Sequence, residues 1–211
     1  MTRPPFLLLL PLLLAACVSL EEPAPAPDHY VLRPHDGGGA EGASPSGVVV
    51  ERPQVAPGLG SDRIAVLRDG RHLDHLADAR WATPLPEMLQ AFFHGALERR
   101  YPHLEAEVAP TGVGSLRLEA TVWDFQAEYE GGADRPPRLH LAMTLRLRRA
   151  DSNRTLGRVR VARTARAEAN RRTAVVAGLE QLLREAFDQA VIALLAEWRE
   201  KTGEPGVVGR G

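Results

Sequence analysis

The sequence predicts an α+β fold, an antiparallel β-sheet with two main helices packed on it. Apolar and polar residues alternate over 115–129, 139–147 and 157–165, and a period of two over segments joined by short turns is typical of an antiparallel meander. Apolar residues recur at spacings of three and four over 84–101 and 171–201, which indicates two amphipathic helices. The apolar stripe of such a helix is normally buried against a sheet, so both patterns belong to one core.

The first half of the domain is predicted to supply short strands and the first helix. Strands are expected at 30–32, 48–50, 64–67 and 72–76. Asp69-Gly70 is a typical hairpin turn between the last two. Thr83 is the expected N-cap of the helix, and Pro84 suits its first position because an N–H there would have no intrahelical acceptor. Tyr101-Pro102 is expected to end this helix.

The second half contains the strongest strand, 115–129, and the longest helix. The alternation in this strand changes phase between Val122 and Trp123, which predicts a β-bulge there. Strands at 139–147 and 157–165 follow, joined by a hairpin loop at 151–153. The closing helix, 171–201, is expected to bury its stripe on the sheet. The last residues, 202–211, are glycine-rich and are expected to form a loose tail.

The first twenty residues have the pattern of a secretory signal. Arg3 precedes a short apolar run, 6–14, and the small residues Ala15-Ala16 follow. The run is shorter than the roughly 20 residues that cross a bilayer. Leu14-Ala15-Ala16-Cys17 resembles the lipobox of bacterial lipoproteins, in which the peptidase cleaves before a lipidated cysteine. An ordinary secretory signal with Cys17 near the cut is the alternative.

The predicted organisation has four parts. They are a lipoprotein signal peptide at 1–16, the acylated Cys17 with a flexible Pro/Ala tether over 17–28, a domain over 29–201, and the tail. In lipoproteins of Gram-negative bacteria an aspartate after the cysteine commonly retains the protein at the inner membrane. By that resemblance, Val18 favours the outer membrane, with the domain facing the periplasm.

Composition and motifs argue against several kinds of site. The net charge of −1 argues against nucleic acid as a main partner. Cys17 is the single cysteine, so a lipidated chain has no thiol left for a disulfide or a cysteine zinc site. His72 and His75 suggest a metal site, but residues three apart in a strand point to opposite faces, which favours an exposed hairpin. The sequence also contains no G-x-S-x-G nucleophile motif and no phosphate-binding glycine loop before a helix, so we expect no catalytic residue, metal or cofactor, and no enzyme activity.

Charged residues on the expected sheet leave two interpretations open. Asp124, Glu128 and Glu130 suggest paired acids, but they fit the polar face of a strand better. Six arginines on neighbouring strands predict either a solvated face or a basic surface for anionic headgroups or an acidic partner. These arginines are Arg146, Arg148, Arg149, Arg158, Arg160 and Arg163.

Three parts of the chain resemble the ABC-type transport auxiliary lipoproteins, a family that includes paraquat-inducible protein C. They are the lipobox and the segments VVVERPQVAPGLGSDRIAVLRDG and ARWATPLPEMLQAFFHGALE. The resemblance implies a non-enzymatic lipoprotein that works with a mammalian-cell-entry-type substrate-binding protein, a permease and an ATPase in lipid transport. We expect the partner to dock on the loops that carry Asp62, Arg63, Trp81 and Pro84, because loops often carry binding. A homo-oligomer is compatible with this role. An assembly lipoprotein of another envelope machine, or an envelope hydrolase, is the alternative.

Overall fold

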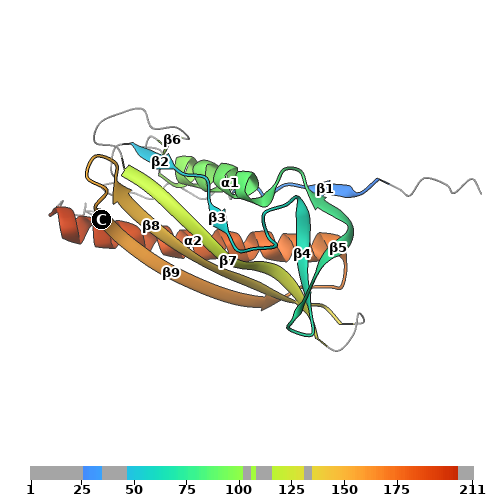
Figure 1. Ribbon diagram of the computed structural model, residues 1–211. Coiled ribbons are helices and arrows are strands. Elements are labelled where there is room, and N and C mark those ends of the chain that lie inside the picture. Colours follow the sequence, from blue (N-terminus) through green and yellow to red (C-terminus); the bar gives the residue numbers. More distant parts are fainter. Residues whose placement is uncertain (1–25, 35–46, 102–105, 108–115, 131–134, 204–211) are drawn as a thin grey trace, which may run out of the picture.

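The computed structural model describes residues 26–34, 47–101, 106–107, 116–130 and 135–203, and these form two layers (Figure 1). One layer is a nine-stranded sheet and the other consists of two helices on one face of it. The predicted signal peptide, Cys17 and the tether up to residue 25 lie outside the described residues, as do residues 204–211 of the predicted tail.

The described residues form nine strands and two helices. The strands are β1 (Asp28–Tyr30), β2 (Val48–Val50), β3 (Gln54–Val55), β4 (Arg63–Arg68), β5 (His72–Trp81), β6 (Ala106–Glu107), β7 (Leu116–Tyr129), β8 (Arg138–Arg149) and β9 (Thr155–Arg166). The helices are α1 (Leu85–Arg100), between β5 and β6, and α2 (Arg172–Thr202), after β9.

The sheet is mixed, which corrects the expectation of an antiparallel sheet. The predicted antiparallel meander of β7, β8 and β9 is present, and β4 and β5 form an antiparallel hairpin. On its other edge, however, β7 pairs with β2, β3 and β4 in turn, and all three run parallel to it. β1 is likewise parallel to β5, and β2 to β6. Parallel neighbours need a crossover connection, and α1 lies in the segment that joins the short strands to β7.

Several strand boundaries differ from those expected. β1 covers 28–30 rather than 30–32, and β5 continues past 76 to Trp81. β3 and β6 were not predicted, because two-residue bridges are too short to show a period. β3 forms by pairing with the edge of β7, and β6 forms by pairing with the edge of β2.

The predicted bulge in β7 is confirmed. The register with β8 shifts between Val122, which pairs with Met143, and Asp124, which pairs with Ala142. Trp123 is therefore the extra residue of the strand. Because of this insertion, Phe125 returns to the same face as Val122, and both are fully buried.

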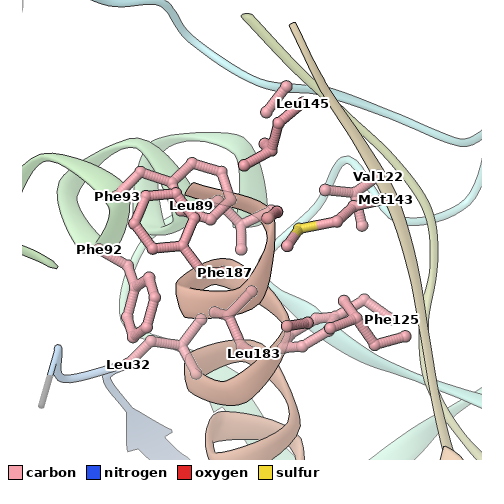
Figure 2. Packing of buried hydrophobic residues seen from close by; sticks show 14 of the residues in the cluster. Leu32, Leu89, Phe92, Phe93, Val122, Phe125, Met143, Leu145, Leu183 and Phe187 are labelled. Atoms are coloured by element: carbon pink, nitrogen blue, oxygen red, sulfur yellow. The ribbon is translucent and has the colours of Figure 1, made fainter. Parts of the chain in front are cut away.

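Aromatic side chains join the two helices to each other (Figure 2). Phe93 of α1 stacks on Phe187 of α2 with ring centroids 4.7 Å apart, and Phe92 meets the same ring edge-on. Burying each such side chain contributes about 1.5–3 kcal/mol. The predicted stripe of α2 is buried throughout: Val175, Leu179, Leu182, Leu183, Ala186, Phe187, Ala190, Val191, Leu194 and Trp198.

Backbone contacts cap the start of α1 and the end of α2. Pro84, rather than Thr83, is the N-cap of α1, and the Leu85 N–H donates to the Ser61 carbonyl at 3.1 Å. The loop before β4 thus satisfies a free donor of the helix. α2 ends at Thr202, one residue into the predicted tail, and Gly203 closes it in a left-handed conformation with φ 71°.

Candidate docking surface

Two loops meet at one corner of the molecule, residues 57–63 before and at the start of β4 and residues 82–84 between β5 and α1. We name these residues the docking corner. The carbonyl of Asp62 accepts the Trp81 N–H at 2.6 Å, and the carbonyl of Ser61 accepts the Leu85 N–H. These two bonds join the loops, so three of the four predicted docking residues lie on one continuous surface.

The predicted docking residues differ in exposure. Arg63 and Pro84 are exposed, while Asp62 is half-buried. The Asp62 carboxylate accepts two hydrogen bonds from Nη1 of Arg80, at 3.0 and 3.2 Å. Nη1 of Arg80 therefore holds the carboxylate against the β4–β5 hairpin, and Arg63 and Pro84 are the side chains presented outward.

The fourth predicted docking residue, Trp81, belongs to the core, because its side chain is only 1% exposed. Its ring stacks on Phe125 of β7, with centroids 5.8 Å apart and an interplanar angle of 25°. Extension of β5 to Trp81 turns the indole inward, so a partner has no access to it in this structure. Trp81 contributes to the docking corner through its backbone N–H.

His75 lies on β5 near the charged side chains of the corner. Burial, followed by the positive charge of Arg63, lowers the pKa of His75 below its usual value, so the imidazole is neutral at neutral pH. His72 is in register with Arg68 and His75 with Ala65, which puts the two histidines on opposite faces, as the sequence predicted. Within the described ranges, no group of three or more histidines, cysteines and carboxylates is placed to hold a metal ion.

The face of β7, β8 and β9 that points away from α1 and α2, here called the open face, carries charged rows. Glu119 of β7 forms ion pairs with Arg146, at 3.4 Å, and with Arg148. Glu128 lies 2.8 Å from the His140 ring, and Asp124 accepts a hydrogen bond from Gln126. The acids of β7 thus form the polar face of a strand, as expected.

The six arginines of the predicted basic surface are divided between the two faces. Arg146, Arg148, Arg158 and Arg160 share the open face, since Arg146 pairs with Arg158 and with Glu119 in the register. Arg163 lies on the helix side and donates to Gln189 of α2 at 2.7 Å. Arg149 is in register with the core residue Leu116, so it also lies on the helix side. The alternation of strand residues separates positions that are close in the sequence.

Two hollows border β7. One, about 260 Å³, is lined by Val66, Leu76 and Tyr129 together with Arg68 and Asn170. Burial raises the pKa of Tyr129, whose hydroxyl donates to Asn170 at 3.0 Å. The other hollow, about 270 Å³, lies on the open face between β2–β3 and β7, and Glu51 and the ion pair of Glu119 with Arg148 line it.

The fold is that of a two-layer α+β domain known from other crystal structures. One, of an uncharacterized protein, superposes with a TM-score of 0.64 at 15% identity, covering 80% of this chain and 99% of that one. Another, of protein XCC0632 from Xanthomonas campestris, a DUF330 protein, gives a TM-score of 0.65 at 21% identity and covers 85% of this chain and 99% of that one. At such identities the likeness shows the fold alone.

Comparison of the sequence with protein families is more specific than comparison of the fold. The family of ABC-type transport auxiliary lipoprotein components matches residues 30–191, and the chain belongs to this family. No curated protein matches the chain at a significant level. Neither helix in the described part of the chain is long and apolar enough to cross a membrane.

Proposed function

We propose that this chain is a lipid-anchored periplasmic lipoprotein that acts, without catalysis of its own, as an auxiliary component of an ABC-type, mammalian-cell-entry-linked lipid transport system. The observation that carries the proposal is the family match over residues 30–191, which includes strands β2 to β9, α1, α2 as far as Val191, and the docking corner. In this role the domain binds the substrate-binding protein and its associated permease and ATPase.

The anchor in this proposal is Cys17. Burying an acyl chain stabilises membrane attachment by about 0.8 kcal/mol per CH2, so two or three chains hold firmly. The residue Val18 favours the outer membrane. Asp28 lies eleven positions after Cys17, and a chain of that length reaches at most about 40 Å. The domain therefore works close to the membrane that holds it.

The entry point of the chain connects the anchor with the docking corner. Tyr30 of β1 is in register with Trp81, and its carbonyl accepts the Ala82 N–H at 2.8 Å. The segment that comes from Cys17 thus joins the domain beside residues 82–84. Anchoring raises the local concentration of this corner near the membrane, so a modest affinity for the partner suffices.

Site-specific crosslinking tests the proposal. A photo-crosslinking amino acid at Arg63 or Pro84 is expected to capture a mammalian-cell-entry-type protein in native membranes, because both side chains are presented outward. The same amino acid at Gln181, exposed on α2, is the matched control and is expected to capture much less.

Other results would contradict the proposal in distinct ways. Recovery of no mammalian-cell-entry-type protein under any mild condition would count against a transport role. Recovery of a component of another envelope machine would favour the assembly role instead. Hydrolysis of an envelope lipid or glycan by the purified protein would establish an enzyme.

A further inference from the structure

β8 and β9 carry an excess of positive charge. Neither strand contains a single aspartate or glutamate, whereas together they hold eight arginines. Six of these share the open face by register: Arg138, Arg146, Arg148, Arg158, Arg160 and Arg166. Carboxylates from the neighbouring segments pair with three of them, as Glu119 pairs with Arg146 and Arg148, and Glu130 with Arg138.

Of the other three, Arg166 donates to the Pro136 carbonyl at 2.9 Å, and the excess is concentrated at Arg158 and Arg160 of β9. Both are exposed, and among the described residues no carboxylate forms an ion pair with either guanidinium. Glu197 of α2 accepts the backbone N–H of Arg158, not its side chain. Arg158 also lies directly opposite Arg146, and like charges in directly opposed positions destabilise a sheet. The fold therefore maintains a positive region that its own acids do not neutralise.

Trp123, the bulge residue, lies beside these arginines. Its indole is 49% exposed, and Nε1 donates to Oγ1 of Thr144 at 3.4 Å. Thr144 is in register with Arg160, so the indole, the hydroxyl and the guanidinium occupy adjacent strands. Two strand spacings amount to ~10 Å, so one extended surface can contact both the indole and the Arg160 guanidinium.

We propose that the basic face, defined as Trp123, Arg146, Arg158 and Arg160, docks the domain on the surface of an anionic phospholipid membrane. The charges fit phosphate headgroups, and a half-exposed tryptophan among cations is typical of side chains at a membrane–water interface. The cations also lie in rows across neighbouring strands of a sheet, which suits an extended surface better than one small anion. The exposed small residues beyond them on β9, Ala162 and Thr164, leave the approach open.

This docking adds a second contact to the proposed anchor. The proposal rests on the proposed function only in that Cys17 brings the domain to a membrane. Binding of vesicles by the unlipidated protein involves no transport partner, so its result is independent of the crosslinking experiment at the docking corner.

Vesicle cosedimentation tests the proposal with the chain from residue 17 onward carrying Cys17→Ser, which contains every described element. We expect binding to vesicles of equal parts phosphatidylglycerol and phosphatidylcholine, none to pure phosphatidylcholine, and loss of binding as salt shortens the Debye length to about 3 Å at 1 M. Arg158→Gln and Arg160→Gln are each expected to weaken partitioning by about fivefold. Arg33→Gln with Arg71→Gln, exposed arginines elsewhere, is the matched control and is expected to leave partitioning unchanged.

Tryptophan fluorescence supplies a second measurement. The chain has three tryptophans, and Trp81 and Trp198 are 1% and 4% exposed, so changes in accessibility report Trp123. We expect anionic vesicles containing brominated lipid to quench this emission, and the quenching to disappear in Trp123→Phe.

Three outcomes would overturn the proposal. They are absence of binding to the anionic vesicles, equal losses in the control and the β9 variants, and displacement by inorganic phosphate at matched ionic strength. The last would indicate a site for a single small anion.

Discussion

Gly58 shows how one residue shapes the loop of the docking corner. Its φ is +91°, a left-handed conformation that residues with a side chain rarely adopt. A Cβ there would lie 2.3 Å from Cδ2 of Leu73. The backbone conformation therefore favours glycine at this position, and a larger residue would in addition have to displace the exposed end of the Leu73 side chain.

We predict that Gly58→Ala lowers the free energy of unfolding by about 1–3 kcal/mol, the usual range for a strained backbone. Leu73→Ala in the same chain is expected to recover part of the loss by removing the clash, but not the part due to φ. Urea denaturation measures both. Gly60→Ala is the matched control, because its nearest neighbour is 3.8 Å from the added Cβ, and an equal loss there would contradict the prediction.

Trp81 illustrates a residue whose sequence context supports two assignments. Its position before a helix start is compatible with a loop that binds a partner and with a residue at the edge of a core. Burial against Phe125 decides for the core, and Phe125 reaches it because of a bulge in β7, more than forty residues later in the chain.

At the scale of elements, α2 is the helix on which the core depends. Leu183 is fully buried, whereas Ile192 on the same helix is 54% exposed. Both positions are apolar in the sequence, and the three-and-four spacing of the stripe includes the first and leaves out the second.

Leu183→Asp is expected to abolish cooperative folding, because a buried carboxylate without a partner is costly even after its pKa rises. Ile192→Asp, the matched control, is expected to change stability by about 0.5 kcal/mol or less, as surface substitutions usually do. Thermal unfolding followed by circular dichroism measures both, and a midpoint near that of the unchanged protein for Leu183→Asp would place that side chain on the surface.

The bulge of β7 allows a test by deletion. Val122 and Asp124 already pair with adjacent residues of β8, Met143 and Ala142, so removal of Trp123 leaves the register on both sides intact. Removal of Gln126 instead moves every later side chain of the strand to the opposite face of the sheet, so Glu128 points toward the core.

We predict that the chain lacking Trp123 unfolds cooperatively, and that the chain lacking Gln126 does not. Near-ultraviolet circular dichroism and a thermal scan distinguish the two. If both deletions were tolerated equally, the pairing of β7 with β8 would not set the inward face of the strand.

At the scale of the whole molecule, the family and the predicted N-terminus indicate how the domain is held. The described domain begins at a short strand beside the docking corner, and Cys17 lies eleven residues before that strand. The predicted anchor would then hold the domain near one membrane, where both the docking corner and the basic face are available for binding.

Cys17→Ala is expected to remove metabolic labelling by a palmitate analogue and to mislocalise the protein, because the thiol that forms the thioether is lost. Labelling in bacterial cells followed by membrane fractionation measures both. Since Cys17 is the single cysteine, no other thiol can substitute, and unchanged labelling of the variant would exclude lipidation at this residue.

Much of the architecture follows from local patterns. The stripe of α2, the alternation of β7, β8 and β9, and the bulge at Trp123 are each contained within one segment, so the sequence determines them by itself. The family assignment also follows from the sequence, since it matches residues 30–191. In each case the information lies in residues a few positions apart.

Only the tertiary structure decided the direction of the short strands and the side of the sheet on which several residues lie. Val66 pairs with Ala127 in parallel, a contact between segments about sixty residues apart. The two residues of β3 are too few to show a period from which its pairing with β7 could be predicted. Likewise Arg160 and Arg163 belong to opposite faces, and Trp81 is buried by a ring from another strand. The physical reason is that a period reports which face of an element is apolar, whereas pairing and burial depend on which distant segment packs against it.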